Sequence, residues 1–301
     1  MNRRVPPHAF FLCSALFHYL GPAFAVLLFA HVRPLGVAWL RIASAGLVFA
    51  IWRRPWRYMR SLRATERATV VALGAVLAAM NACFYVAIDR LPLGTVGAIE
   101  FAGPIALAAA GTRTRRNLLA LVLAGAGVYA LSRVRLAGDP RAYVFAFANC
   151  ALFMLYIVLG HRIAARGGTG GIDQLGAAML VAMVAALPIG VRDAAPAFAD
   201  PKLLGAAVGV GVSSSVIPYV CDQLAMARLS RSTFALLLAL LPATATVVGL
   251  LALRQVPTVV DLAGIGLVIG GVALHRAAPA RAAGRDVRSR PAVRGNTAQS
   301  G

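Results

Sequence analysis

Long runs of apolar residues, nearly free of charge, alternate with short polar segments along most of the chain. A helix needs about 17–25 such residues to cross ~30 Å of hydrocarbon. Ten segments meet this requirement: 8–30, 34–52, 68–88, 92–111, 117–132, 143–160, 174–191, 203–226, 232–253 and 258–275. Strands of a membrane barrel would alternate apolar and polar positions, whereas 118–131 and 236–253 are apolar almost throughout. The pattern predicts an all-α membrane protein with ten transmembrane helices.

Composition and charge support a membrane protein and give its orientation. Of the 301 residues, 60% are hydrophobic and 13% are charged, against about 25% charged in soluble domains, which excludes an ordinary soluble enzyme. The net charge of +20 would suggest nucleic acid in a soluble protein. With the N-terminus inside, however, 21 basic residues fall on the inner side and eight on the outer. The positive-inside rule therefore predicts a multi-pass protein of the cytoplasmic membrane with both termini cytoplasmic, and no nucleic-acid partner.

The C-terminal segment and the cysteines add no candidate binding or metal-ligating residues. Residues 277–301 mix arginine with alanine, glycine and proline, which predicts a disordered cytoplasmic tail that contacts anionic lipid. Cys13, Cys83, Cys150 and Cys221 lie inside predicted spans without metal-ligand spacing. They are interpreted as small apolar residues, and no metal or cofactor is expected.

An internal repeat divides the chain into two halves. Residues 90–97 align with residues 228–235 at an offset of 138. The predicted repeats are 8–136 and 137–276, with five spans each. Because five is odd, the two repeats have opposite orientation in the membrane, which is a common plan of secondary transporters.

The same offset superposes Pro104 on Pro242. A proline lacks an N–H, so Pro104 leaves the carbonyl of Glu100 without its helical partner, and Pro242 does the same to Leu238. Either proline alone is an ordinary kink that neighbouring helices can satisfy. The matched pair predicts broken helices at mid-membrane depth, where such transporters bind their substrates.

Glu100 is the most informative residue, because it is one of only two glutamates and lies inside a predicted span. An acid at the bilayer centre costs ~2.5–3.5 kcal/mol even on a lenient scale. A carboxyl at this depth can carry a proton or hold an ammonium group, but not both at once, which is the chemistry of an antiporter. The alternative is a neutral glutamate hydrogen-bonded within the bundle. Glu66, in an arginine-rich inner loop, is interpreted as a surface residue.

Two other charged residues lie in predicted spans. Asp222 follows Pro218-Tyr219, and is either a second proton or substrate group or a solvated residue near the cytoplasmic end. Arg41, seven residues into the second span, either pairs with a carboxylate in a substrate cavity or extends its guanidinium to the interface.

Several polar side chains in otherwise apolar spans are candidates to line a cavity. Each alone is more often a packing residue, but together they would suit a small polar cavity. They are His18, Asn81, Tyr85, Tyr156 and Tyr219. Enzymatic signatures are lacking, since the five histidines form no i,i+4 pair and the serines at 213–215 have no base nearby in sequence.

A family resemblance rests on several of these segments. They are residues 40–43, 54–57, 80–81, 84–85 and 91–94, Glu100-Phe101-Ala102-Gly103-Pro104, Tyr156-Ile157, Pro218-Tyr219, Asp222, Arg228-Leu229 and Pro242. They resemble the EamA-type branch of the drug/metabolite transporter superfamily, most of all its inner-membrane threonine/homoserine exporters. The Glu-Phe-x-Gly-Pro element is the most specific part. Over about residues 12–275 the resemblance implies a ten-helix bundle of two repeats.

The resemblance also implies a function and shows two departures from the family pattern. The implied activity is export of small amino acids or related amphiphilic metabolites against protons. The family usually carries a glutamate just before the second proline, where this chain has Leu241, and another after the ninth helix, where it has Gln255. Glu100 would then act alone or with Asp222.

The predicted protein is a secondary transporter with Glu100 and Asp222 as coupling residues. Its partners are a small-molecule substrate, protons and membrane lipids, and it acts as a monomer or homodimer without a cofactor. The alternatives are a multidrug or nucleotide-sugar carrier of the same superfamily, or a membrane enzyme or scaffold that transports nothing.

Overall fold

The computed structural model describes residues 6–111, 114–133, 139–164, 171–226 and 241–274. Within these residues all regular structure is helical and no strand occurs, which confirms the all-α prediction for this part of the chain. The helices are α1 (Pro7–Leu28), α2 (Pro34–Arg53), α3 (Pro55–Ser61), α4 (Ala64–Ile88), α5 (Leu93–Gly111), α6 (Arg115–Arg133), α7 (Pro140–Ala164), α8 (Gly171–Gly190), α9 (Ala195–Ala199), α10 (Pro201–Gly211), the π-helix η1 (Val212–Val216), α11 (Ile217–Met226), α13 (Leu241–Leu253) and α14 (Val259–Leu274).

Proline marks the beginning of several helices, because its missing N–H costs nothing in the first turn and its fixed φ suits a helix. Helices α1, α2, α3, α7 and α10 all begin with proline. Helix α14 begins instead with a capping box: the backbone N–H of Thr258 donates to Asp261, whose own N–H donates to the Thr258 hydroxyl. Such signals place the helix ends close to the boundaries that hydropathy predicts.

The outer surface of the bundle is apolar, as lipid contact requires. Ile51, Leu251 and Val259 are 81%, 76% and 83% exposed, and apolar surface on this scale would be an aggregation hazard in water. Six of the described helices are long and apolar enough to cross a membrane, and three shorter apolar helices accompany them. The predicted ninth span, 232–253, is described only from Leu241, so the ten-span layout stays a prediction.

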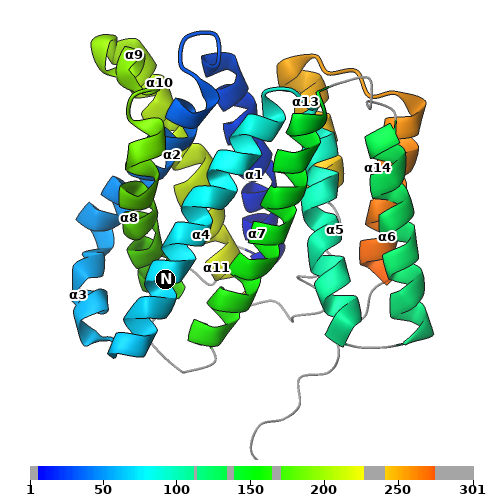
Figure 1. The fold of residues 1–301 in the computed structure, drawn as a ribbon, viewed down its shortest axis with the longest axis horizontal. Coiled ribbons are helices and arrows are strands. Elements are labelled where there is room, and N and C mark those ends of the chain that lie inside the picture. The colour runs from blue at the N-terminus through cyan, green and yellow to red at the C-terminus, as the bar shows by residue number, and fades with distance from the viewer. Residues whose placement is uncertain (1–5, 112–113, 134–138, 165–170, 227–240, 275–301) are drawn as a thin grey trace, which may run out of the picture.

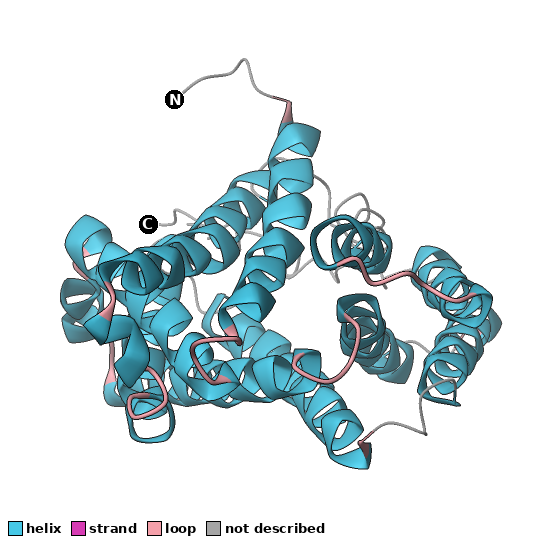
Figure 2. Ribbon diagram, turned by 90° about the horizontal axis from the view of Figure 1, so that it is seen from above, coloured by secondary structure: helices cyan, strands magenta, loops and turns pink. Residues whose placement is uncertain are grey.

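The helices stand side by side, with α6 and α14 as a pair at one edge (Figures 1 and 2). Helix α2 packs on α8, α4 on α7 and α8, and α1 on α11 and α13, while α5 contacts α6, α7 and α13. Small residues allow close approach: a Cβ added to Gly127 would lie 2.5 Å from the carbonyl oxygen of Gly264. Close backbone contact is typical of helix pairs in membranes.

The predicted eighth span, 203–226, is interrupted in its middle. It begins as α10, passes through the five-residue π-helix η1 and continues as α11. A π-helix shifts the hydrogen bonds from i→i+4 to i→i+5 and often marks a functional site. This one contains the three serines 213–215 and lies inside the bundle, where Ser214 and Ser215 are fully buried.

Candidate substrate site

Glu100 lies inside the bundle on α5 and is 5% exposed. Three groups from other helices lie within electrostatic range of its carboxyl: Tyr19 on α1, and Asn149 and Cys150 on α7. Tyr19 reaches α5 one turn before Glu100, since a Cβ added to Gly97 would lie 2.9 Å from the Tyr19 hydroxyl. The acid thus sits where α5 packs on α7 and where Tyr19 extends from α1.

Arg41 brings a buried cation to the same region. It is 5% exposed, its Nε donates to the Ser215 hydroxyl at 2.8 Å, and its Nη2 donates to the Ser214 carbonyl at 2.9 Å. Its guanidinium carbon lies 5.5 Å from the centre of the Tyr85 ring, a cation–π distance. Arg41 is also within electrostatic range of Glu100 and His18. It therefore joins α2, α4 and η1 to the surroundings of Glu100.

The π-helix and two glycines explain why Arg41 can bind there. A π-helix replaces the i→i+4 backbone hydrogen bonds of an α-helix by i→i+5 bonds. Ser214 supplies its carbonyl to Arg41 while its hydroxyl bonds back to Val210. Close packing holds this segment, since a Cβ added to Gly21 of α1 would lie 2.2 Å from the Ser214 Cβ, and one added to Gly211 would lie 2.5 Å from the Ser44 Cβ.

Several buried polar atoms of this cluster lack a hydrogen-bond partner among the described residues. They are the hydroxyls of Tyr19 and Tyr85, the Oε2 of Glu100 and both amide atoms of Asn149. The Tyr85 hydroxyl lies near Arg41 and Ser214, and the Asn149 amide lies near Glu100, but neither contact has the geometry of a full hydrogen bond. Unsatisfied polar groups are costly in a buried site, so their concentration at one place makes this cluster the candidate substrate site.

Comparisons with known proteins place the chain among membrane transporters. Residues 140–276 match the model of the EamA-like transporter family. The threonine/homoserine exporter RhtA of Escherichia coli K12 is 30% identical over 256 residues, which cover 83% of this chain and 84% of the relative. RhtA of Salmonella typhimurium SL1344 gives the same identity and coverage. The chain belongs to the EamA-like transporter family. It is therefore a membrane transporter, as its resemblance to the threonine/homoserine exporters implied.

A solved structure shows the same fold. A crystal structure described only as that of a protein matches with a TM-score of 0.56 and 17% sequence identity, over 89% of this transporter and 95% of the other chain. At this identity the likeness concerns the arrangement of the helices.

The structure brings some predicted site residues of the transporter to the cluster and places others apart. His18 lies edge-on to Tyr19, with ring centres 5.2 Å apart, so it belongs to the cluster. The Asn81 amide donates to the Leu77 carbonyl of its own helix at 2.8 Å, which satisfies that donor locally. Tyr156 is partly buried and stacks on Phe153, and Tyr219 is also partly buried, at the beginning of α11.

Three other predicted residues are described only by their backbone. Pro104 lies within α5, which continues to Gly111, and Pro242 is the second residue of α13. Asp222 lies on α11, and its side chain is outside the described part of the structure. The roles assigned to these residues stay predictions. The predicted tail, 277–301, also lies outside the described residues.

Sequence reasoning missed Asn149, Tyr19 and the serines of η1 as members of the site. Asn149 is fully buried in an apolar helix, and the signal that selected Asn81, an amide inside a predicted span, applied to it equally. Tyr19 follows His18 directly in the same predicted span, so the argument that selected His18 applied to it equally. Ser214 and Ser215 were considered only as nucleophiles, because no sequence signal links them to Arg41.

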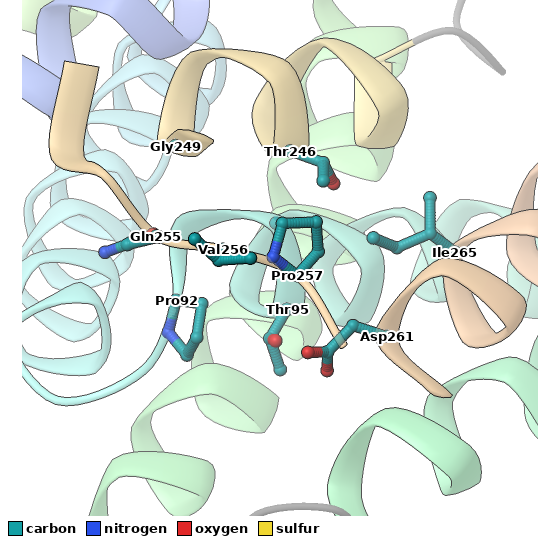
Figure 3. A pocket seen from close by; sticks show the side chains of 10 residues that line it. Pro92, Thr95, Thr246, Gly249, Gln255, Val256, Pro257, Asp261 and Ile265 are labelled. Carbon is teal, nitrogen blue, oxygen red and sulfur yellow. The ribbon is translucent and has the colours of Figure 1, made fainter. Parts of the chain in front are cut away.

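Two clefts lie away from the cluster. The first is near the beginning of α5 and is lined by Thr95, Thr246, Gln255, Pro257 and Asp261 among others (Figure 3). At about 20 Å³ it has room for little more than one water molecule. There the Gln255 side chain accepts a hydrogen bond from the Leu93 N–H at 3.1 Å. Gln255, which stands where the family usually has a glutamate, therefore caps the beginning of α5.

The second cleft has a volume of about 420 Å³ and opens where α2 meets α3. Trp52, Arg57, Tyr58 and Ser61 line it together with the ion pair between Arg53 and Asp173, whose atoms are 2.7 Å apart. Burial, with the negative charges of Glu66 and Asp173, raises the pKa of Tyr58. The mixture of tryptophan, tyrosine and arginine is typical of the membrane interface.

Proposed function

We propose that this protein is a secondary active transporter that exports small amino acids or related metabolites across the cytoplasmic membrane in exchange for protons. The observation that carries the proposal is the buried carboxyl of Glu100, surrounded by polar groups from both halves of the chain. Tyr19 and Arg41 come from the first half, and Asn149 and Ser214 from the second. A site made by both halves is what alternating access about a fixed centre needs.

Glu100 suits proton exchange because its carboxyl is buried within the transmembrane bundle. Intramembrane acids commonly carry protons in transporters. In the proposed cycle, an ammonium group of the substrate binds the ionised carboxylate, and a proton replaces the substrate when it leaves. Since one carboxylate cannot hold both at full strength, movement of the substrate and of the proton are coupled in opposite directions.

The packing pattern supports two inverted repeats. In the proposed alignment, α1, α2, α4, α5 and α6 correspond to α7, α8, α10–α11, α13 and α14. Contacts in one half then have counterparts in the other. The packing of α4 on α7 corresponds to that of α11 on α1, and the packing of α5 on α7 corresponds to that of α13 on α1. Three counterpart pairs, α2 with α8, α5 with α13 and α6 with α14, pack on each other. A two-fold axis between the halves produces such a pattern.

The direction of one counterpart pair also fits an inverted arrangement. Arg53, at the end of α2, pairs with Asp173 near the beginning of α8, at 2.7 Å. Arg33, just before α2, pairs with Asp193, just after α8, at 3.5 Å. The two helices are therefore antiparallel, as counterparts must be when the axis lies in the membrane plane.

The choice of amino acids as substrates draws on the exporters that this chain resembles, at 30% identity. Their printed names give threonine and homoserine as substrates. A multidrug or nucleotide-sugar carrier of the same superfamily is the alternative, and it predicts flux of other compounds through the same bundle.

The test uses purified protein in liposomes with an acidic lumen. Protons leaving the lumen should drive accumulation of radiolabelled threonine or homoserine, and dissipating the pH gradient should abolish it. Glu100→Gln should remove the pH-driven accumulation while the protein still inserts and elutes as a single species. Glu66→Gln is the matched control, since it alters the only other glutamate, and should transport like the parent.

Two results would overturn the proposal. Accumulation by Glu100→Gln at the parental level would remove Glu100 from the coupling mechanism. Flux of drugs or nucleotide sugars without flux of amino acids would replace the substrate class.

A further inference from the structure

The two charges of the cluster are buried without an ion-pair partner among the described side chains. Arg41 and Glu100 are each 5% exposed. The ion pairs of the described residues lie instead at helix ends, between Arg33 and Asp193, Arg53 and Asp173, and Arg90 with Asp89 and Asp139. A buried charge without an ion-pair contact is unfavourable. Among the described side chains the two charges are in electrostatic range of each other but form no ion pair, so a ligand that carries both signs of charge would satisfy both residues.

The position of the two residues along their helices brings them to one level. Arg41 lies seven residues after the first residue of α2, and Glu100 lies seven residues after the first residue of α5. Both helices begin at the upper end of the bundle in Figure 1. At 1.5 Å per residue each lies about 10 Å below the beginning of its helix. Their charges are within electrostatic range of each other, so both can act on the same ligand.

Two hydrogen bonds fix the orientation of the Arg41 guanidinium and leave other N–H donors for a ligand. The two hydrogen bonds to η1 use two of its five N–H groups, and the Tyr85 ring covers one of its faces. Neutral acceptors on a π-helix orient the cation without neutralising it. A guanidinium held in this way is suited to two parallel hydrogen bonds with a carboxylate.

We propose that Arg41 is the residue that binds the substrate's α-carboxylate, and that the transporter therefore requires a zwitterion with a free carboxylate. This inference rests on the proposed function and names the chemical group that the site selects. Glu100 binds the ammonium group at the other end of the same molecule. The unpartnered hydroxyls of Tyr19 and Tyr85 and the amide of Asn149 are available to a short polar side chain, such as a hydroxyl.

Selectivity follows from the penalty of leaving a buried group unpaired. An amine or amide analogue would pair with Glu100 and leave Arg41 without an anion. A site built around a polar contact rejects an analogue that lacks the partner more strongly than an apolar pocket rejects a change of size. The free carboxylate, more than the length of the side chain, should decide which compounds compete for the site.

The experiment measures competition against radiolabelled threonine uptake in liposomes with an acidic lumen, with threonine, threoninamide and homoserine lactone as competitors. The parent should bind threoninamide and the lactone at least about 100-fold more weakly than threonine. Arg41→Gln should reduce the preference for threonine over threoninamide to within about threefold. Arg41→Lys should keep part of it, because the charge remains and the bidentate geometry is lost. Arg192→Gln, an exposed arginine in the loop after α8, is the matched control and should discriminate like the parent.

The inference and the proposed function fail in different ways. Suppose the parent accumulates threonine under a pH gradient, but threoninamide competes within about threefold as strongly as threonine. The carboxylate assignment is then wrong and the transporter proposal stands. Unchanged discrimination by Arg41→Gln would also overturn the assignment. If Arg41→Gln does not fold, the parental comparison still decides, together with Ser215→Ala, which should weaken competition by threonine more than by threoninamide.

Discussion

Gly21 is the position where a single methyl group should disturb the substrate site from a distance. A Cβ at this residue of α1 would lie 2.2 Å from the Cβ of Ser214, 2.8 Å from its Cα and 2.9 Å from its backbone nitrogen. Non-bonded carbon atoms rest about 3.5–4.0 Å apart. Gly21→Ala therefore requires α1 and η1 to separate by more than about 1 Å, because the obstructing atoms include backbone that no rotamer change can move.

The size of the effect follows from overpacking and from the contact that the separation strains. Overpacking a close-packed interior costs about 1–3 kcal/mol, and the upper part of this range is expected here. Ser214 is also the residue whose carbonyl accepts from Arg41 at 2.9 Å. Displacing η1 should therefore weaken the hold on the guanidinium and lower transport together with stability.

Thermal unfolding in detergent and threonine accumulation in liposomes measure the two effects. Gly209→Ala is the matched control, because Gly209 lies on α10, which continues into η1, and a Cβ there would meet no atom within 4 Å. Gly21→Ala should unfold several degrees below the parent and transport less, whereas Gly209→Ala should be close to the parent in both. Equal stability and transport for the two variants would refute the close packing of α1 on η1.

Two further predictions concern the ends of helices. Thr258→Val removes the hydroxyl that caps α14 by accepting from the Asp261 N–H at 3.2 Å and should cost about 1 kcal/mol; detergent unfolding at the parental temperature would contradict this. The pair between Arg53 and Asp173 is partly exposed, with side-chain exposures of 37% and 18%, so a double-mutant cycle should give a coupling below about 1 kcal/mol, and a much larger value would show that the pair is shielded from solvent.

Hydropathy predicted the long described helices because burial in lipid imposes a strong compositional rule. The predicted spans 34–52 and 174–191 lie close to α2 at Pro34–Arg53 and α8 at Gly171–Gly190. The interruption at Val212–Val216 could not be predicted in the same way. Its serines are short and its flanks are apolar, so the local sequence is compatible with a regular α-helix. The π-helix is accompanied by packing against Gly21 and by hydrogen bonds from Arg41, residues more than 170 positions earlier.

The candidate site could be predicted through its charges and through His18 and Tyr85, but not through its other neutral members. Glu100 and Arg41 were conspicuous because charge inside a span is rare, and the structure places both in one buried cluster. The orientation of neutral groups depends on the tertiary structure: Asn81 bonds to its own helix, whereas Asn149 lies near Glu100. Both are asparagines in apolar helices, and only the packing of α7 against α5 distinguishes them.

The most direct test of the account follows protons and substrate together. A pH-sensitive dye inside liposomes with an acidic lumen reports proton release when threonine is added outside, while radiolabelled threonine reports uptake. The parent should release protons in a fixed ratio to the threonine that enters, and Glu100→Gln should release none in response to threonine. Proton release by Glu100→Gln in the parental ratio would contradict the central claim that this buried carboxyl couples the two movements.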